Sequence, residues 1–164
     1  MPQSAQEISL LARKWLFRQE WDFAARPDDR DIGLYAKALL VCAKGDGVIS
    51  QQERDWVLGY FAAYCGDAET LEELAVYPAE DDVTTLVTRS AIVYETRGSL
   101  VFDALRACDA DGELTADEVA RIKQAAAALE ISGETVERLK ELYLQEKTAR
   151  SERNTLLYPE GSPI

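Results

Sequence analysis

The feature that most constrains the fold of this chain is an acidic phrase that occurs twice. Residues 46–53 read Asp-Gly-Val-Ile-Ser-Gln-Gln-Glu, and residues 111–118 read Asp-Gly-Glu-Leu-Thr-Ala-Asp-Glu. The two copies lie 65 positions apart without a gap, and the same offset aligns residues 69–72 with residues 134–137. A fixed offset over this length indicates a duplicated structural unit. The sequence therefore predicts an internal pseudo-repeat with one acidic corner in each half.

The hydrophobic pattern predicts an all-α fold. Apolar residues recur at helical spacing along nearly the whole chain, and Ser-x-x-Glu or Thr-x-x-Glu capping boxes mark several helix starts. We expect a compact single-domain bundle of about seven or eight helices, in which one helix beginning near residue 81 is broken at Gly98. We assign residues 1–150 to this helical domain. Residues 151–164 are expected to form an irregular tail, because glycine and proline gather near its end.

Composition excludes several classes of function. The chain of 164 residues has no histidine, which removes Ser-His-Asp and Cys-His catalysis and nearly all zinc enzyme sites. Its net charge of −12 disfavours nucleic acid as a partner. The three cysteines form no Cys-x-x-Cys pair, which favours free thiols in a reducing compartment. We find no nucleophile motif, phosphate-binding loop or cofactor fingerprint, so we expect a protein that is not an enzyme.

The hydropathy pattern predicts neither a membrane span nor an exported protein. No apolar run approaches the roughly 20 residues that cross a bilayer. The first residues also lack the basic and apolar parts of a signal peptide. We therefore expect a cytoplasmic location.

Each acidic corner has two interpretations. In the first, Asp-Gly forms a tight turn, and Ser50 with Glu53, or Thr115 with Glu118, caps the outgoing helix. In the second, the phrase is part of an EF-hand-like loop that binds a cation through oxygen ligands. Capping alone accounts for the residue types, so the sequence leaves both interpretations open.

The second corner fits the EF-hand pattern better than the first. With Gly112 at position 6, Asp109 falls at position 3, Asp111 at position 5 and Glu118 at position 12. Position 1 is Ala107, which offers no oxygen. A loop that lacks its first carboxylate should bind Ca²⁺ weakly, with a dissociation constant of about 10⁻⁴ to 10⁻³ M.

In the first corner, Cys42 and Lys44 occupy positions 1 and 3, which leaves Asp46, Ser50 and Glu53 as oxygen ligands. The candidate ligands of a weakly bound divalent cation (Ca²⁺, Mg²⁺ or Mn²⁺) are Asp46, Glu53, Asp109, Asp111 and Glu118. A degenerate EF-hand-type calcium regulator is the alternative function.

With its paired corners, its helical pattern and the constant offset between its halves, the chain resembles the tellurite-resistance TerB family over about residues 30–147. The same fold occurs in the co-chaperone DjlA. The resemblance implies a non-enzymatic protein of metalloid or general stress response, which acts with a protein partner associated with the membrane. It also implies divalent metal binding at the residues that match both phrases: Asp46, Glu53, Asp111 and Glu118. Lys44-Gly45 departs from the Ala-type lead-in of the second corner.

Overall fold

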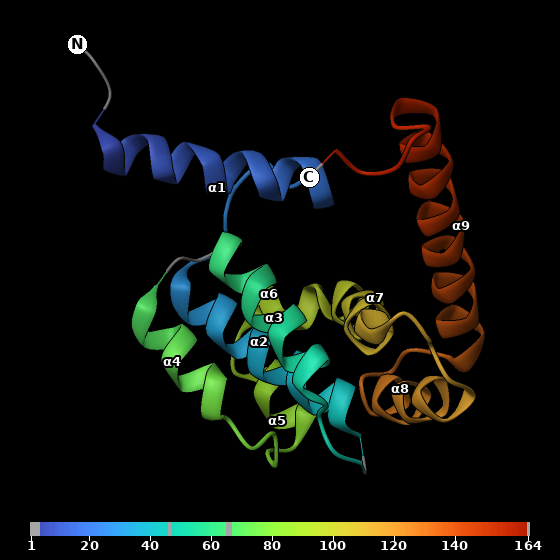
Figure 1. Cartoon of the computed structure of the whole chain (residues 1–164). Helices are drawn as coiled ribbons and strands as arrows, with labels where there is room; N and C mark the ends of the chain where they lie inside the picture. The colour runs from blue at the N-terminus through green and yellow to red at the C-terminus, as the bar shows by residue number, and fades with distance from the viewer. Residues whose placement is uncertain (1–3, 46, 65–66, 164) are drawn as a thin grey trace.

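The computed structural model describes residues 4–45, 47–64 and 67–163. Within these ranges the chain forms nine α-helices, one short 3₁₀ helix and no strand (Figure 1). The helices are α1 (Ala5–Trp21), α2 (Asp29–Lys44), α3 (Gln51–Tyr64), α4 (Ala68–Val76), α5 (Val83–Thr88), α6 (Ala91–Glu95), α7 (Arg97–Cys108), η1 (Asp109–Asp111), α8 (Ala116–Ala128) and α9 (Gly133–Leu157). The predicted all-α, single-domain fold is confirmed.

The helix bounds follow the duplication. Helices α3 and α8 begin at Gln51 and Ala116, and α4 and α9 begin at Ala68 and Gly133. The offset within each pair of starts equals the offset between the two copies of the acidic phrase. Helices α2 and α7, which lead into the two corners, pack on each other more extensively than any other pair of described helices. The core of the protein is therefore built around the contact between the two halves.

The core consists of apolar side chains that α2 and α7 direct toward each other and toward α5 and α8. Leu40 and Leu105 occupy matching positions of the two halves, and both side chains are fully buried. Ile122 of α8 and Leu86 of α5 close the core from two sides. Burying a Leu or Ile side chain contributes about 1.5–3 kcal/mol.

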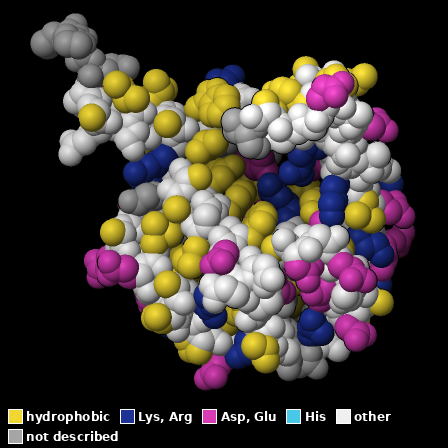
Figure 2. Space-filling model, viewed as in Figure 1, with side chains coloured by type: hydrophobic (Ala, Val, Ile, Leu, Met, Phe, Trp, Pro, Cys, Tyr) yellow, Lys and Arg dark blue, Asp and Glu magenta, His cyan; other side chains and the backbone are white. Residues whose placement is uncertain are grey.

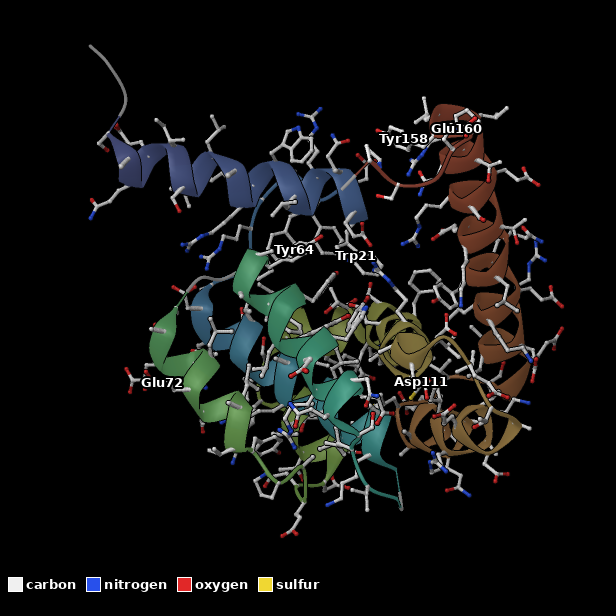
Figure 3. All side chains as sticks on the ribbon, viewed as in Figure 1. Trp21, Tyr64, Glu72, Asp111, Tyr158 and Glu160 are labelled. Atoms are coloured by element: carbon white, nitrogen blue, oxygen red, sulfur yellow. The ribbon has the colours of Figure 1, made fainter. Side chains whose placement is uncertain are left out.

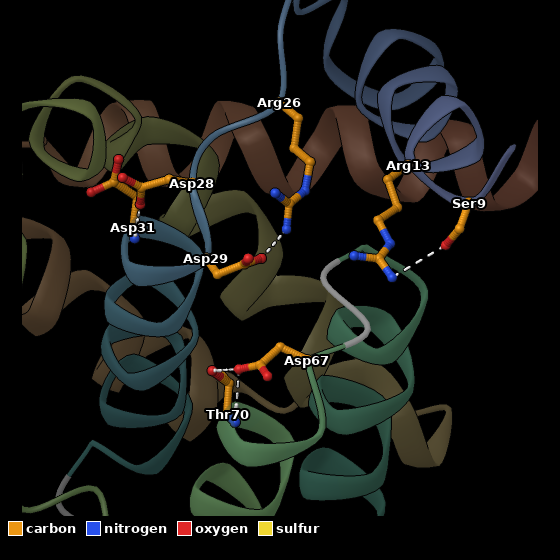
Figure 4. A network of polar contacts seen from close by, with 8 residues as sticks. All are labelled: Ser9, Arg13, Arg26, Asp28, Asp29, Asp31, Asp67 and Thr70. Carbon is orange, nitrogen blue, oxygen red and sulfur yellow. Dashed lines mark hydrogen bonds and ion pairs between the residues drawn. The ribbon is translucent and has the colours of Figure 1, made fainter. Parts of the chain in front are cut away.

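Aspartate side chains cap three of these helices, α2, α4 and α5. Asp28 accepts a hydrogen bond from the backbone N–H of Asp31 at 2.8 Å and caps α2 (Figure 4). Asp67 accepts one from the N–H of Thr70 at 3.1 Å and caps α4. A carboxylate at this position satisfies an N–H group that has no partner within the helix and lies at the positive end of the helix dipole. Part of the chain's acidity is therefore used to start its helices.

The helix expected between residues 81 and 98 is two helices. The first of them, α5, ends before Arg89. Ser90 then accepts a hydrogen bond from the N–H of Val93 at 3.3 Å and starts α6. Gly98 does not end a helix, because it lies in the first turn of α7. Serine competes for backbone hydrogen bonds inside a helix and prefers the cap, so Ser90 rather than Gly98 sets the boundary.

The last helix is longer than the sequence indicates. Helix α9 continues to Leu157, past the predicted end of the helical domain at residue 150. The expected irregular tail 151–164 therefore begins as helix, and regular structure ends at Leu157. Residues 151–157 are mostly polar and contain neither glycine nor proline, so nothing stops the helix before the residue that precedes Pro159.

Candidate functional site: two converging acidic corners

Both acidic corners start their outgoing helices with a capping box. In the first corner the backbone N–H of Ser50 donates to Glu53 Oε2 at 2.6 Å, and Ser50 Oγ accepts from the N–H of Glu53 at 3.1 Å. The second corner repeats this arrangement, with Thr115 N–H to Glu118 Oε2 at 2.7 Å and Glu118 N–H to Thr115 Oγ1 at 3.2 Å. The predicted capping interpretation is confirmed in both halves.

The turn of the second corner also has the predicted form. Gly112 has a φ of 97°, a backbone conformation that glycine adopts without strain. Asp111 Oδ1 accepts a hydrogen bond from the N–H of Glu113 at 3.0 Å, which closes the turn. Asp111 is exposed at the junction between α7 and α8 (Figure 3). One oxygen of this carboxylate is thus used by the turn.

The two corners converge on Cys108. Burial raises the pKa of this thiol, and the negative charges of Glu53 and Glu118 raise it further. Glu53 comes from the first corner and Glu118 from the second, so a carboxylate from each half acts on the same thiol. The charge of Arg121 acts on the same thiol in the opposite direction. Charged side chains from both halves thus act on one buried thiol.

Arg121 also covers the first corner. Gly45 has a φ of 52°, and a Cβ at this position would lie 2.7 Å from Arg121 Cδ. The Nε atom of Arg121 is buried and has no hydrogen-bond partner within the part of the chain that the structure describes. An arginine packed this closely against Gly45 explains why a glycine is needed there, in addition to its positive φ. It also brings a positive charge to the first corner, and this charge acts on the Cys108 thiol against those of Glu53 and Glu118.

Asp109, expected as a cation ligand, is instead engaged by α9. Its side chain is buried, and its Oδ2 atom accepts a hydrogen bond from the hydroxyl of Tyr143. The same oxygen forms an ion pair with Lys147 Nζ at 2.5 Å. This carboxylate oxygen therefore already has a positively charged partner and a hydroxyl donor.

The contact of Asp109 has a counterpart in the first half. Lys44, which the repeat aligns with Asp109, donates from Nζ to the backbone carbonyl of Pro78 at 2.9 Å. The partners Pro78 and Tyr143 are aligned by the same offset. The same pair of positions is therefore in contact in both halves, although the residues and their charges differ. This pattern supports an anchoring role for Asp109.

The predicted ligands do not all come together. Glu53 and Glu118 converge near Cys108, Asp111 lies at the turn, and Asp109 is turned toward α9. Asp46 lies outside the described residues. Within ranges 4–45, 47–64 and 67–163, no three Asp, Glu or Cys side chains form a group that could hold a metal ion. A complete ligand shell made of described residues would therefore need backbone carbonyls or water.

The two described cysteines are protected thiols. Burial raises the pKa of Cys42 to about 12 and also raises that of Cys108. Since the thiolate is the reactive form, neither side chain is suited to redox or metalloid chemistry at neutral pH.

We expect native Cys42 and Cys108 to react with a disulfide reagent at least ~100-fold more slowly than in the urea-unfolded chain, because little thiolate is present. The measurement is the labelling rate at pH 7.5 in a Cys65→Ser background. Native thiols that react as fast as unfolded ones would contradict this assignment.

A second polar cluster lies inside the protein, and the sequence analysis did not find it. Asp103 of α7 is fully buried, and its Oδ2 atom accepts a hydrogen bond from the hydroxyl of Tyr35 at 2.9 Å. Its Oδ1 atom lies 3.1 Å from Arg106 Nη1. The guanidinium of Arg106 also pairs with Glu20 of α1 and lies 5.3 Å from the ring centroids of both Trp56 and Tyr60.

Desolvation raises the pKa of Asp103 to about 7, and this effect outweighs the opposing charge of Arg106. The carboxyl group also lines an apolar cavity of about 40 Å³. That space suits one or two water molecules, not a substrate of ordinary size. The signal in the sequence was an acidic residue inside the buried stripe of α7, flanked by Val101, Ala104 and Leu105.

Comparison with solved structures identifies the family. The chain matches the crystal structure of a tellurite resistance protein from Nostoc punctiforme with a TM-score of 0.93 and 35% sequence identity. The match covers 99% of this chain and 100% of that chain. The chain belongs to the TerB-like tellurite-resistance family. No protein-family model and no curated protein matches it. In this TerB-like chain, no described helix has the length and apolar character needed to cross a membrane.

Proposed function

We propose that this TerB-like protein is a non-enzymatic component of a tellurite-resistance or related stress response, and that its acidic corners bind a divalent cation weakly. The observation that carries the proposal is the match along the whole chain to a protein described as a tellurite resistance protein. The repeated corners are the feature of this chain best suited to a cation, because they concentrate carboxylates in both halves.

The geometry of the corners supports a weak site. Glu53 and Glu118 each use Oε2 in a capping box, and both lie near Cys108. The positive charge of Arg121 acts on the same thiol as these two carboxylates, and a positive charge in this region reduces the attraction for a divalent cation. Ca²⁺ prefers six to eight oxygen ligands. We therefore expect a dissociation constant of about 10⁻⁴ to 10⁻³ M for Ca²⁺, with Mg²⁺ and Mn²⁺ as further candidates.

The interior supports a function that depends on binding. The thiols of Cys42 and Cys108 are held protonated, and Asp103 faces a cavity with room for water alone. We therefore propose that the protein acts through a protein partner and catalyses no reaction of its own.

The test is a calorimetric and thermal titration with Ca²⁺, Mg²⁺ and Mn²⁺. At 10 mM cation and a dissociation constant near 1 mM, binding should raise the melting temperature by about 3–6 °C. The double variant Asp111→Asn/Glu118→Gln should lose this rise. Both substitutions remove a charge and keep the oxygen that the turn or the capping box uses.

Glu7→Gln is the matched control, because Glu7 forms the same kind of capping box at the start of α1. That variant should retain the full rise in melting temperature. If the wild-type protein gives no heat of binding and no shift with any of the three cations, the cation part of the proposal is wrong.

A further inference from the structure

Helix α1 carries apolar side chains on two opposite faces. Its inner face buries Phe17, whose ring meets that of Tyr64 edge-on at 4.8 Å, while Trp21 donates from Nε1 to the hydroxyl of Tyr60 at 3.1 Å. Its outer face carries a stripe of three large apolar side chains at helical spacing, which we call the outer stripe: Ile8, Leu11 and Trp15. Their exposed fractions are 52%, 54% and 58%. A helix that is apolar on both faces is normally covered on both.

The position of α1 leaves the outer stripe accessible. The helix packs on α3 near its C-terminal end, and its N-terminal half extends past the body of the molecule (Figure 1). Trp21 and Tyr64 lie beneath the helix, on the side that faces the body (Figure 3). Hydrophobic side chains gather along the exposed side of α1 in the space-filling view (Figure 2). Large apolar side chains exposed along one face of a helix mark a candidate contact site.

The spacing of the outer stripe fits a second helix. Intervals of three and four residues between Ile8, Leu11 and Trp15 match the a and d positions of a helix–helix seam. If two copies of α1 cross antiparallel about Leu11, Ile8 of one copy lies against Trp15 of the partner subunit. The large side chain then fills the space beside the smaller one at both ends of the contact.

The charges of α1 favour this antiparallel arrangement. Glu7 lies at one end of the outer stripe and Arg18 at the other, with no acidic residue between Glu7 and Glu20. An antiparallel pair brings Glu7 of each copy toward Arg18 of the other copy. A parallel pair would instead place the two Arg18 side chains, which have the same charge, opposite each other. The rest of the chain has a strongly negative charge, while α1 has three basic and two acidic residues. Two copies of a chain with net charge −12 therefore meet with least repulsion at α1.

We propose that the outer stripe of α1 is a homodimer interface, in which two copies pair antiparallel through Ile8, Leu11 and Trp15. This interface is separate from the acidic corners and does not depend on cation binding. Two paired helices bury less surface than a standard interface of about 1,200–2,000 Å², so the dimer is a reversible one. An anionic lipid surface would attract Arg18 but repel Glu7, whereas a second antiparallel copy offers an opposite charge to both, so a second copy is the better occupant of the stripe.

Sedimentation velocity from 5 to 200 µM tests the proposal. Wild-type protein should move from the 18.3 kDa monomer toward twice that mass as concentration rises. Leu11→Asp should weaken dimerisation at least tenfold without unfolding the protein, because this side chain is already exposed. Val76→Asp is the matched control, since Val76 is 80% exposed on α4. That variant should dimerise like the wild type.

Charge exchange tests the antiparallel register. Glu7→Lys and Arg18→Glu should each weaken dimerisation several-fold, because each creates two like-charge contacts per dimer. An equimolar mixture of the two variants should restore it, since the mixed dimer has two opposite-charge contacts. A wild-type monomer at 200 µM would overturn the proposal, and so would a Leu11→Asp variant that dimerises normally. A monomeric wild type that binds anionic vesicles through the stripe would assign this surface to lipid and would also overturn it.

Discussion

Replacing Asp103 by alanine is expected to lower the free energy of unfolding by about 3–5 kcal/mol, the usual cost of removing one partner from a buried ion pair. The substitution leaves the largely buried guanidinium of Arg106 without one of its two carboxylate partners and the Tyr35 hydroxyl without its acceptor. It also opens space beside an existing cavity. Urea unfolding at pH 7 measures the loss. Glu95→Ala, on an exposed side chain, should stay within about 0.5 kcal/mol of the wild type.

Asp103 should also make stability depend on pH in an unusual direction. Its pKa of about 7 in the folded protein lies above the ordinary value of about 3.9 for an unfolded chain. Between the two pKa values Asp103 is protonated in the folded state and ionised in the unfolded state. Its contribution to the free energy of unfolding is therefore complete below pH 4 and is lost as pH rises to 7. The expected loss between pH 5 and pH 7 is on the order of 2 kcal/mol.

Asp103→Asn provides the comparison for this pH effect. Asparagine keeps the shape of the side chain and an acceptor for Tyr35, but it does not titrate. The difference in unfolding free energy between wild type and Asp103→Asn should therefore change with pH, in favour of the variant as pH rises. A difference that stays constant from pH 5 to pH 8 would show that Asp103 is ionised throughout this range, held by Arg106.

The parts of this protein that could be predicted from sequence are local or repeated. A capping box needs two residues three positions apart, so Ser50 with Glu53 and Thr115 with Glu118 were recognisable without any tertiary information. The constant offset then predicted that the two halves share their helix starts, and α3 and α8 do. Local hydrogen bonds and duplication leave their pattern directly in the sequence.

The contacts that could not be predicted join residues far apart in the chain. Tyr35 and Asp103 are 68 positions apart, and the bond between them depends on how α2 packs against α7. Numbering the second corner as an EF-hand loop placed Asp109 among the cation ligands, but α9 brings Tyr143 and Lys147 to its carboxylate. Spacing along a loop does not show which distant helix will reach a side chain first.

The second large effect is expected at the contact between the two halves. Leu40→Ala and Leu105→Ala should each lower the free energy of unfolding by about 2–5 kcal/mol, the cost of lost burial plus the remaining cavity. Both side chains are fully buried, and the repeat places them at matching positions of α2 and α7. Because these helices pack on each other, the duplication predicts two losses of similar size. Urea unfolding of the two variants measures both.

Leu142→Ala is the control for the loss of methyl groups outside this contact. Leu142 lies on α9 and is 38% exposed, so its truncation should cost clearly less than either core variant. If Leu40→Ala and Leu105→Ala both behaved like this control, the two halves would not share a tightly packed core. If one were costly and the other mild, the chain would have kept the duplicated helices while one half lost its contribution to stability. Equal large losses are the outcome that a core built from two copies of one helical unit requires.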